Sequence, residues 1–538
     1  MIDIGLIWRT VRHLTVRQIF YQLWNRVRSR PRLYLPTHTP LACFLTVPTP
    51  DKPVCWNDGG FTFLNKSVVF DQQIDWNYAA HGKLWTYNLT YFDFLNQPNV
   101  TPDAGISLIR DFIIQTDTLR DGLEPYPTSL RIINWVQFLS YHQINDAYIN
   151  THLFAQVRLL RRRLEYHLGG NHLLENGFAL LIGALYFQHR HWFRTTSKLI
   201  RSEITTQILA DGGHIERSPM YHQILLDRLL FVMLALQHDS WQDDPNLVSF
   251  LTQKVSQMLG WLNAITFRNG DVPMVNDAAL GIALTTKQLL TKADQVISRA
   301  SLKTILKTSG YRIFRQSRYE LFCDVGSIGP DHQPGHAHAD TFSFVLHVDN
   351  QPFIIDSGTS TYQIGQQRDY ERSTAAHNTV EIAGANSSEV WAGFRVGHRA
   401  WVTVSEDTDT FLAASHDGYK KAGVIHRRSW TVESTQLIIV DQLIPTDHHH
   451  TVAKRVGIAR FHFHPDIPIY IQDSQVVAGN TRFSFTSVTD CNFYVTQYTM
   501  AEGFNRLRSG QCLEIAFTDT LTTTLTLLHE NSLPNLLF

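Results

Sequence analysis

The sequence has almost no excess charge, few cysteines and no long apolar run. Its 47 Lys and Arg residues nearly equal its 48 Asp and Glu residues, so no bulk electrostatic attraction to nucleic acid is expected. The five cysteines are scattered and form no CxxC pair, which argues against a disulfide framework and a cysteine-based zinc knuckle. No uninterrupted apolar stretch reaches about 18 residues, so we expect no membrane-spanning segment.

The N-terminus also lacks an uninterrupted apolar core and a small-residue cleavage site, so we expect no signal peptide. This favours a cytoplasmic or membrane-peripheral protein, with the periplasm as the alternative. The segment instead alternates arginines with apolar residues at roughly helical spacing: Arg9, Arg12, Arg17, Arg26, Arg28 and Arg30 with Ile7, Leu14, Ile19, Phe20 and Leu23. Such a basic amphipathic helix either contacts an anionic membrane surface or packs on its own protein.

The chain is long and rich in aromatic residues and histidine. Its 538 residues exceed one ordinary core, and 43% hydrophobic with 18% charged residues is typical of a folded protein. Aromatic residues at 12% and 26 histidines are common in carbohydrate clefts and metal sites.

Two periodicities follow one another along the chain. Apolar residues at intervals of three and four predict helices over 106–113, 130–141, 153–168, 172–186, 197–209, 221–236 and 247–262. From Tyr311 the period is two, which predicts strands over 319–325, 341–348, 351–358, 377–384, 429–434, 436–443 and 460–465. Residues 35–100, rich in Pro, Asn and aromatics, are expected to be irregular.

Helices followed by strands, without βαβ alternation, predict an α+β chain whose two parts pack separately. We expect residues 1–100 to form a basic helix and an irregular segment that pack on the helical part. Residues 101–305 would form a curved or toroidal array of helical hairpins, and residues 306–538 an antiparallel β-sheet domain.

The first polar motif is GGNHLLENGFALLIGALYF, residues 169–187. Gly169 and Gly170 end one helix, and Asn171 can cap the next. Helical spacing then places His172, Glu175 and Asn176 within one turn, which indicates a helix end facing a cleft. An N-cap with a surface ion pair is the alternative.

The second motif is DGGHIERSPMYHQILLDR, residues 211–228. Ser218 and Pro219 suit the first positions of a helix, which places Tyr221 in its first turn. A phenol with an ordinary pKa of about 10 is a proton donor at neutral pH. Simple packing of this tyrosine at a helix start is the alternative.

The third motif joins GHAHADTFSF to a downstream IIDSGT and RSTAAHNT, within residues 331–384. His336, His338, Asp356 and His377 can meet where neighbouring strands end. Nitrogen and oxygen ligands of this kind suit zinc or a similar divalent ion. The run His448–His450 is expected to be a solvated turn, and the histidines of FHFHP an ordinary strand end.

These motifs resemble the heparinase II/III family of polysaccharide lyases. The resemblance rests on NHLLENGFAL, SPMYH, GHAHADTFSF, IIDSGT and RSTAAHNTV, with WTYNLTYFDFL and EPYPTSLRIINWVQF further upstream, and it is clear over about residues 80–410. It implies an incomplete (α/α) toroid followed by an antiparallel β-sandwich, and cleavage of uronate-containing polysaccharides by β-elimination. The basic N-terminus is similar to that of members associated with bacterial exopolysaccharide or capsule production.

The resemblance also implies roles for individual residues. It makes Asn171, His172, Glu175 and Tyr221 cleft residues and His336 a catalytic histidine. It makes His338, Asp356 and His377 ligands of a structural zinc ion.

Elimination removes the C5 proton of a uronate and expels the oxygen on C4. Asn171 and His336 would stabilise the carboxylate as charge develops, with Glu175 able to hold a proton. Tyr221 or His172 would be the base, and Tyr221 the acid.

Five further residues are candidate contacts of an acidic sugar. Arg131, Asn134 and Trp135 share one predicted helix, while Tyr362 and Arg372 lie close to the third motif. Core packing of Trp135 and a buried ion pair of Arg372 are the alternatives.

Three rival functions stay open at this point. A metal-dependent glycan hydrolase would use the histidine cluster as its catalytic centre. A non-catalytic protein of an exopolysaccharide assembly system would only bind the polymer. A glycoside hydrolase could use Glu175 and Glu216 as its carboxylate pair. The polymer, endo or exo cleavage and the oligomeric state stay undetermined.

Overall fold

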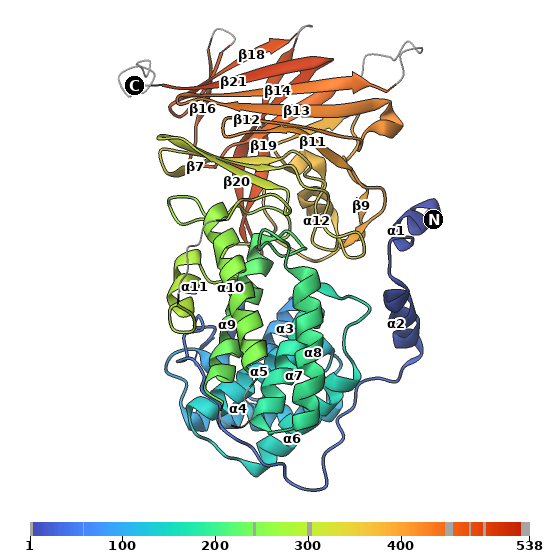
Figure 1. Ribbon diagram of the computed structural model, residues 1–538, viewed down its shortest axis with the longest axis vertical. Coiled ribbons are helices and arrows are strands. Elements are labelled where there is room, and N and C mark those ends of the chain that lie inside the picture. The colour runs from blue at the N-terminus through green and yellow to red at the C-terminus, as the bar shows by residue number, and fades with distance from the viewer. Residues whose placement is uncertain are drawn as a thin grey trace.

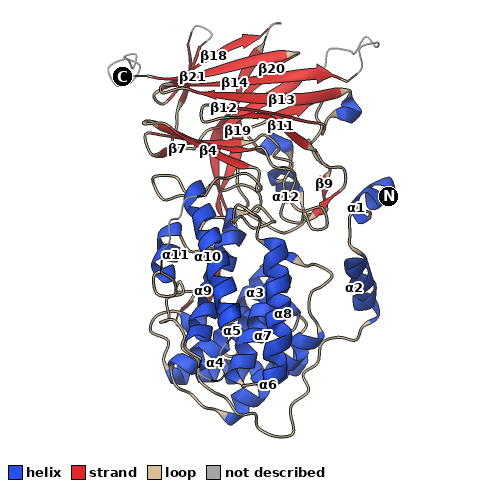
Figure 2. Ribbon diagram, in the orientation of Figure 1, coloured by secondary structure: helices blue, strands red, loops and turns tan. Residues whose placement is uncertain are grey.

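The computed structural model describes residues 4–57, 59–239, 241, 244–298, 304–446, 456–472, 475–487 and 491–528. A bundle of helices lies below a body of antiparallel strands (Figures 1 and 2). This confirms the predicted α+β fold class, with helices in the first part of the chain and antiparallel sheets in the second. The predicted turn at His448–His450 lies outside the described residues.

The N-terminal region is more regular than the sequence suggests. It contains α1 (Ile4–Val11), α2 (Val16–Val27), β1 (Trp56–Asn57), β2 (Gly60–Phe63), β3 (Lys66–Val69), α3 (Lys83–Tyr91) and η1 (Asp93–Asn96). The prediction of an irregular segment over 35–100 is therefore wrong in part. Leu64 and Asn65 both have positive φ, as a tight two-residue hairpin turn between β2 and β3 requires, and Phe61 and Phe63 are buried.

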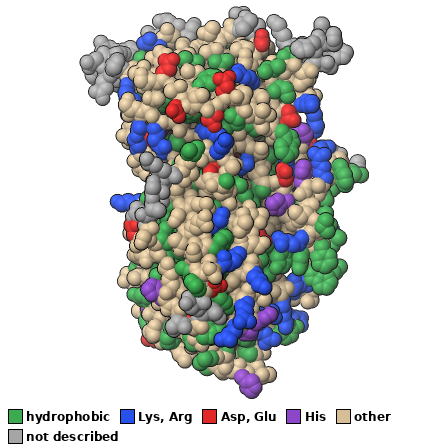
Figure 3. Space-filling view, viewed as in Figure 1, with side chains coloured by type: hydrophobic (Ala, Val, Ile, Leu, Met, Phe, Trp, Pro, Cys, Tyr) green, Lys and Arg blue, Asp and Glu red, His purple; other side chains and the backbone are tan. Residues whose placement is uncertain are grey.

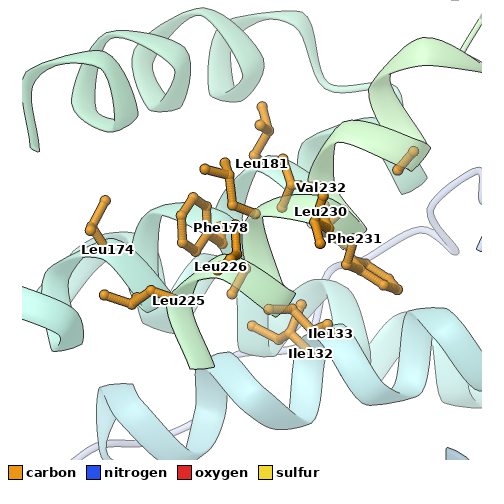
Figure 4. Packing of buried hydrophobic residues seen from close by; sticks show 14 of the residues in the cluster. Ile132, Ile133, Leu174, Phe178, Leu181, Leu225, Leu226, Leu230, Phe231 and Val232 are labelled. Carbon is orange, nitrogen blue, oxygen red and sulfur yellow. The ribbon is translucent and has the colours of Figure 1, made fainter. Parts of the chain in front are cut away.

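The helical body is built around α7, which is apolar on nearly all sides. The remaining helices are α4 (Pro102–Gln115), η2 (Thr116–Thr118), α5 (Pro125–Tyr141), α6 (Ala147–Arg162), α7 (Gly170–Tyr186), α8 (Arg190–Gln207), α9 (Pro219–Gln237), α10 (Pro245–Ile265) and α11 (Thr286–Ala293). Each of the seven helices predicted over 106–262 corresponds to one of α4 to α10. Figure 4 shows Phe178 and Leu181 of α7 among side chains of α5 and α9, such as Ile132 and Leu226. A helix that is hydrophobic all round has to lie inside the protein.

One described helix, α9, is long and apolar enough to cross a membrane by length and composition alone. However, 78% of its most apolar stretch is buried inside the helical body. Its composition is thus that of a core helix.

The strands form a sandwich. They are β4 (Tyr311–Arg315), β5 (Tyr319–Asp324), β6 (Phe344–Val348), β7 (Gln351–Ile354), β8 (Val380–Ile382), β9 (Val390–Trp391), β10 (Arg395–Val396), β11 (Val402–Asp407), β12 (Phe411–His416), β13 (Val424–Val432), β14 (Gln436–Pro445), β15 (Gly457–His462), β16 (Ile469–Gln472), β17 (Gln475–Ala478), β18 (Thr481–Ser487), β19 (Asn492–Gly503), β20 (Arg506–Phe517) and β21 (Thr520–Leu527). An eight-stranded sheet, β11-β12-β13-β14-β21-β18-β17-β16, shares one core with the sheets β19-β20-β15-β8 and β4-β5-β6-β7.

The two bodies meet through loops that carry the predicted motifs. The Ser218 hydroxyl, just before α9, donates to the Asp277 carbonyl, and the Asp277 N–H donates to the His336 carbonyl. The short helix α12 (Gln366–Glu371) lies at the same junction (Figure 1). Polar groups from both halves therefore gather between the helices and the sandwich.

Candidate active site

A buried carboxylate that the sequence analysis missed organises this junction. Asp277 is fully buried in the loop after α10, and one of its oxygens lies 2.9 Å from His336 Nδ1. The other oxygen lies 2.9 Å from His338 Nε2, and Arg368 donates from both terminal nitrogens. Burial alone would raise the pKa of Asp277, but Arg368 and the two histidines hold it well below its usual value.

Asp277 thereby sets the orientation of both histidines of the HxH motif. An ionised carboxylate accepts from N–H groups, so His336 carries its proton on Nδ1 and leaves Nε2 available. His338 donates from Nε2 instead, so the two rings make opposite use of their nitrogens. The sequence offers only Asn276-Asp277 in a short segment between helices, which matches no motif.

Tyr221 lies in the first turn of α9, as predicted. Ser218 accepts from the Tyr221 N–H, and Pro219 occupies the first helical position. The phenol oxygen is 3.0 Å from that of Tyr362, and the ring centre is 4.1 Å from that of His336. Tyr221 from the helices and His336 from the sandwich side therefore lie in direct contact at the junction.

The environment keeps Tyr221 protonated. Burial, with Tyr362 and Asp277 nearby, raises the pKa of the Tyr221 phenol well above its usual value. At neutral pH the side chain is a proton donor, and a phenolate base at this position is disfavoured.

The start of α7 approaches His336 through Glu216, whose carboxylate lies 3.8 Å from His336 Nε2, but Asn171 is not the cap of this helix. Gly169 occupies the N-cap position, and the Asn171 amide instead donates to Glu216 at 2.7 Å. Gly170 has a φ of +51°, and a Cβ there would lie 2.0 Å from a Glu216 oxygen, so only glycine fits. Burial would raise the pKa of Glu216, but His214, His336 and the Asn171 hydrogen bonds lower it, so this carboxylate is ionised.

His172 faces the junction with a side chain that is 30% exposed. Its Nδ1 lies 3.2 Å from Glu165, and its ring contacts Tyr126 with centres 4.4 Å apart. A proton on Nδ1 leaves Nε2 available, the same arrangement that Asp277 imposes on His336. Glu165 and Tyr126 were not assigned roles from the sequence motifs.

The structure contradicts the prediction that Glu175 takes part in the reaction. Its side chain is fully buried, and Arg228 Nε donates to it at 3.1 Å. Burial raises the pKa of Glu175 despite Arg228, yet no exposed part of the side chain can reach a sugar. With Glu216 also buried and bound to Asn171, the carboxylate pair of a glycoside hydrolase is not presented to a substrate.

Of the five predicted sugar contacts, only Tyr362 lies at the site. Arg131, Asn134 and Trp135 are fully buried within the helical body, and Arg372 is 1% exposed. Arg131 donates to Gln156 and to two backbone carbonyls, and Arg372 donates to the Ala337 carbonyl. The structure contradicts these four assignments, because the side chains hold loops together inside the protein.

Substituting Arg131 with Met should therefore reduce stability rather than substrate affinity. Loss of the guanidinium leaves Gln156 and the carbonyls of Thr90 and Gly122 without their donor. We therefore expect the free energy of unfolding to fall by about 3 kcal/mol. Urea unfolding measures this, with Arg110→Met as the control because Arg110 is half exposed. A raised KM with unchanged stability would restore Arg131 as a sugar contact.

The predicted zinc ligands are close together but only partly free. His377 Nδ1 lies 2.8 Å from an oxygen of Asp356, whose other oxygen accepts the Gly358 N–H. Among the described residues, His338 Nδ1 and His377 Nε2 have no hydrogen-bond partner although both are buried, and their ring centres are 5.3 Å apart. Within the same part of the chain, no three His, Cys, Asp or Glu side chains are already arranged around a common metal position. Two unpartnered imidazole nitrogens fit a zinc ion, while Asp356 as it stands orients His377.

The architecture, a helical array joined to an antiparallel sandwich, is similar to that of solved polysaccharide lyase structures. A heparinase III structure has a TM-score of 0.66 at 16% identity, covering 99% of this chain and 93% of the other. A chondroitin AC lyase from Streptomyces coelicolor A3, in complex with chondroitin sulphate, has a TM-score of 0.52 at 10% identity over 84% of this chain and 75% of the other. At these identities the likeness shows the fold.

Sequence comparison identifies the family. The heparinase II/III N-terminus matches residues 128–301, and the heparinase II/III-like C-terminal domain matches residues 301–527. The chain belongs to the heparinase II/III family. A heparin-sulfate lyase of Bacteroides stercoris is 23% identical over 311 residues, and one of Pedobacter heparinus is 25% identical over 279 residues. These matches cover 52% and 47% of this chain but only 44% and 40% of the two relatives.

Proposed function

We propose that the protein cleaves a uronate-containing polysaccharide by β-elimination. The observation that carries the proposal is the contact between the protonated Tyr221 phenol and the Asp277-oriented His336 imidazole. The relatives described as heparin-sulfate lyases support the same reaction class.

The developing negative charge needs donors near the substrate carboxylate. When the C5 proton leaves, the carboxylate approaches an enolate dianion, and hydrogen-bond donors that are already oriented stabilise it. We assign this task to His336, which would donate from Nε2 once that nitrogen is also protonated, and to the second N–H of the Asn171 amide, whose first N–H is bonded to Glu216. Asp277 and Glu216 act as positioning residues because they hold these two side chains.

Proton transfer is divided between a phenol and an imidazole. The raised pKa of Tyr221 makes it the acid that protonates the departing oxygen. His172, with Nε2 free, is the base that removes the C5 proton. A positioned acid or base contributes roughly 10²- to 10⁴-fold to the rate.

The acid side of the pH profile tests the base. Burial lowers the pKa of His172, but Glu165, with Glu216 and Glu175 behind it, raises the pKa overall. Because a base works only when deprotonated, kcat/KM should rise with pH through this raised pKa. In Glu165→Gln, burial lowers the pKa of His172 with less opposition, so the rise should move to lower pH by about one unit or more. If both proteins show the same acid limb, His172 is not the base.

A panel of polymers tests the activity itself. The purified protein is incubated with glycosaminoglycans, alginate and bacterial capsule polysaccharides, and products are followed by the ultraviolet absorbance of the unsaturated uronate. At least one polymer should give this absorbance. A capsule or exopolysaccharide substrate would support the role in polymer production that the resemblance implies. Binding without any product would favour a non-catalytic protein.

We also propose that His338 and His377 hold a structural zinc ion. When bound, the ion would tie together the loops that carry His336 and His377, and its charge would satisfy two buried nitrogens. The three predicted ligands are at most 4% exposed, which favours a structural ion over a catalytic one.

We expect elemental analysis to find about one zinc per chain. His377→Ala should lose the metal and melt at a lower temperature, whereas His464→Ala, on a partly exposed ring, should do neither. Metal-free protein that melts like metal-loaded protein would contradict this.

A further inference from the structure

The two N-terminal helices turn their apolar sides to the solvent. Trp8 is 67% exposed, Phe20 59% and Trp24 49%. The other exposed large hydrophobic residues of this segment are Ile4, Ile7, Val11, Val16, Ile19, Leu23, Val27, Tyr34 and Leu35. Figure 3 shows the hydrophobic side chains as a continuous patch at the edge where Figure 1 places α1 and α2.

The polar sides of the same helices face the protein. Arg9 of α1 makes a two-pronged pair with Glu389 at 2.7 Å, and the Trp391 indole donates to Thr10. In α2, Gln18 is buried and donates to the His332 carbonyl. A surface helix normally buries its apolar side and exposes its polar side, and here the arrangement is reversed. The segment does pack on its own protein, one of the two expectations from the sequence, but mainly through polar contacts that leave most of its large apolar side chains exposed.

Positive charge borders the apolar patch. Residues 4–50 contain no Asp or Glu. Directly after α2, a cavity of about 170 Å³ opens between the extended chain and α6. None of the described residues that line it is acidic, and six are arginines: Arg28, Arg30, Arg32, Arg158, Arg162 and Arg163.

The arginine cavity is held in shape from both sides. Arg163 donates to the Ser29 carbonyl, and Arg28 donates to the Arg162 carbonyl. Burial, together with Arg28, lowers the pKa of Arg163, so the guanidinium groups are close enough to repel one another. An anion of phosphate size in the cavity would relieve this repulsion.

We propose that α1, α2 and the arginine cavity form a docking face for an anionic lipid bilayer, with the cavity taking a lipid phosphate group. Aliphatic and aromatic side chains next to arginines are the composition of helices that lie in the membrane interface. A second copy of the chain fits less well, because a symmetric contact would place the arginine clusters of both copies against each other. An acidic polysaccharide would satisfy the arginines but leave the aliphatic side chains in water.

Docking in this way would place the junction of the two bodies near the lipid. Gln18 of α2 donates to the carbonyls of Leu168 and His332, each four residues before a site histidine, His172 and His336. The active site would therefore meet a polymer close to the membrane surface. The proposed membrane docking is independent of the proposed lyase activity.

Vesicle co-sedimentation of the full chain tests the proposal. We expect binding to vesicles of phosphatidylglycerol mixed with phosphatidylcholine, little binding to phosphatidylcholine alone, and weakening by salt. The variant Trp8→Ser/Phe20→Ser/Trp24→Ser should bind at least about tenfold more weakly. The matched control, Trp401→Ser/Tyr494→Ser/Leu507→Ser, changes residues of similar exposure on the sandwich and should bind like the original protein.

Charge variants separate the cavity from the apolar patch. Arg158→Gln/Arg162→Gln should lower binding to the anionic vesicles by about tenfold, and Arg482→Gln/Arg506→Gln on the sandwich should not. Thermal melting confirms that each variant is folded. The proposal is overturned if the chain does not bind anionic vesicles, or if both triple variants bind equally. It is also overturned if light scattering without lipid shows that the original protein is a dimer and that the N-terminal triple variant, unlike the sandwich triple variant, is a monomer.

Discussion

The Tyr221→Phe variant should form unsaturated product at roughly 10²- to 10⁴-fold lower kcat, with little change in melting temperature. The substitution removes one hydroxyl, whose hydrogen-bond partner in the structure is the Tyr362 hydroxyl. Packing against His336 stays, because the aromatic ring is kept. Initial rates at saturating polymer measure the effect.

Tyr362→Phe is the matched control, because it removes the same hydrogen bond from the other side. It leaves the Tyr221 hydroxyl in place, so we expect a much smaller loss of kcat. If the two variants lose activity equally, the hydrogen bond matters rather than the Tyr221 proton. If Tyr221→Phe turns over normally, Tyr221 is not the acid.

The Asp277→Asn variant should lose both stability and activity. An amide in place of the carboxylate turns one acceptor into a donor and leaves the Arg368 charge buried without its partner. Removing one member of a buried ion pair costs about 3–5 kcal/mol, measured by urea unfolding. His336 would also lose its fixed orientation, so kcat should fall by about 10²-fold or more.

The control for this prediction is Glu389→Gln, which breaks the partly exposed pair with Arg9. A pair of this kind contributes about 1 kcal/mol or less. The double variant Asp277→Asn/Arg368→Gln should recover part of the stability, because the unpaired charge is gone. If the Asp277→Asn protein is as stable and as active as the original, Asp277 does not orient the site histidines as described.

The sequence predicted each helix from α4 to α10 and several strands, but no individual strand after residue 465, so the long strands β19 and β20 were missed. Helices α4 to α10 and strands such as β13 and β14 carry enough apolar repeats to be recognised alone. The short hairpin of β2 and β3 depends on two residues with positive φ, Leu64 and Asn65, of which Leu64 is not a typical turn residue. This hairpin could therefore be predicted only with knowledge of the tertiary contacts that bury Phe61 and Phe63.

Site residues could be predicted from the sequence where they belong to a recognisable motif. They could not be predicted where their role depends on whether the side chain is buried. Tyr221 and His336 lie in recognisable segments, whereas Asp277 is one acidic residue in a loop without a motif. Arg131 and Glu175 have the right chemistry, but their exposure is set by helix packing that no local pattern reveals. The reversed N-terminal helices show the same limit, because the sequence indicates an amphipathic helix without telling which side faces the protein.

Cleavage in water enriched in oxygen-18 tests the central claim most directly. A hydrolase incorporates one water oxygen at every cut, whereas β-elimination adds none and leaves an unsaturated sugar at the new non-reducing end. We therefore predict unsaturated products that lack one water and carry no oxygen-18 from bond cleavage, and that form roughly 10²- to 10⁴-fold more slowly in the Tyr221→Phe variant. Products of full hydrated mass, with oxygen-18 at the new reducing end and no unsaturated sugar, would contradict the account.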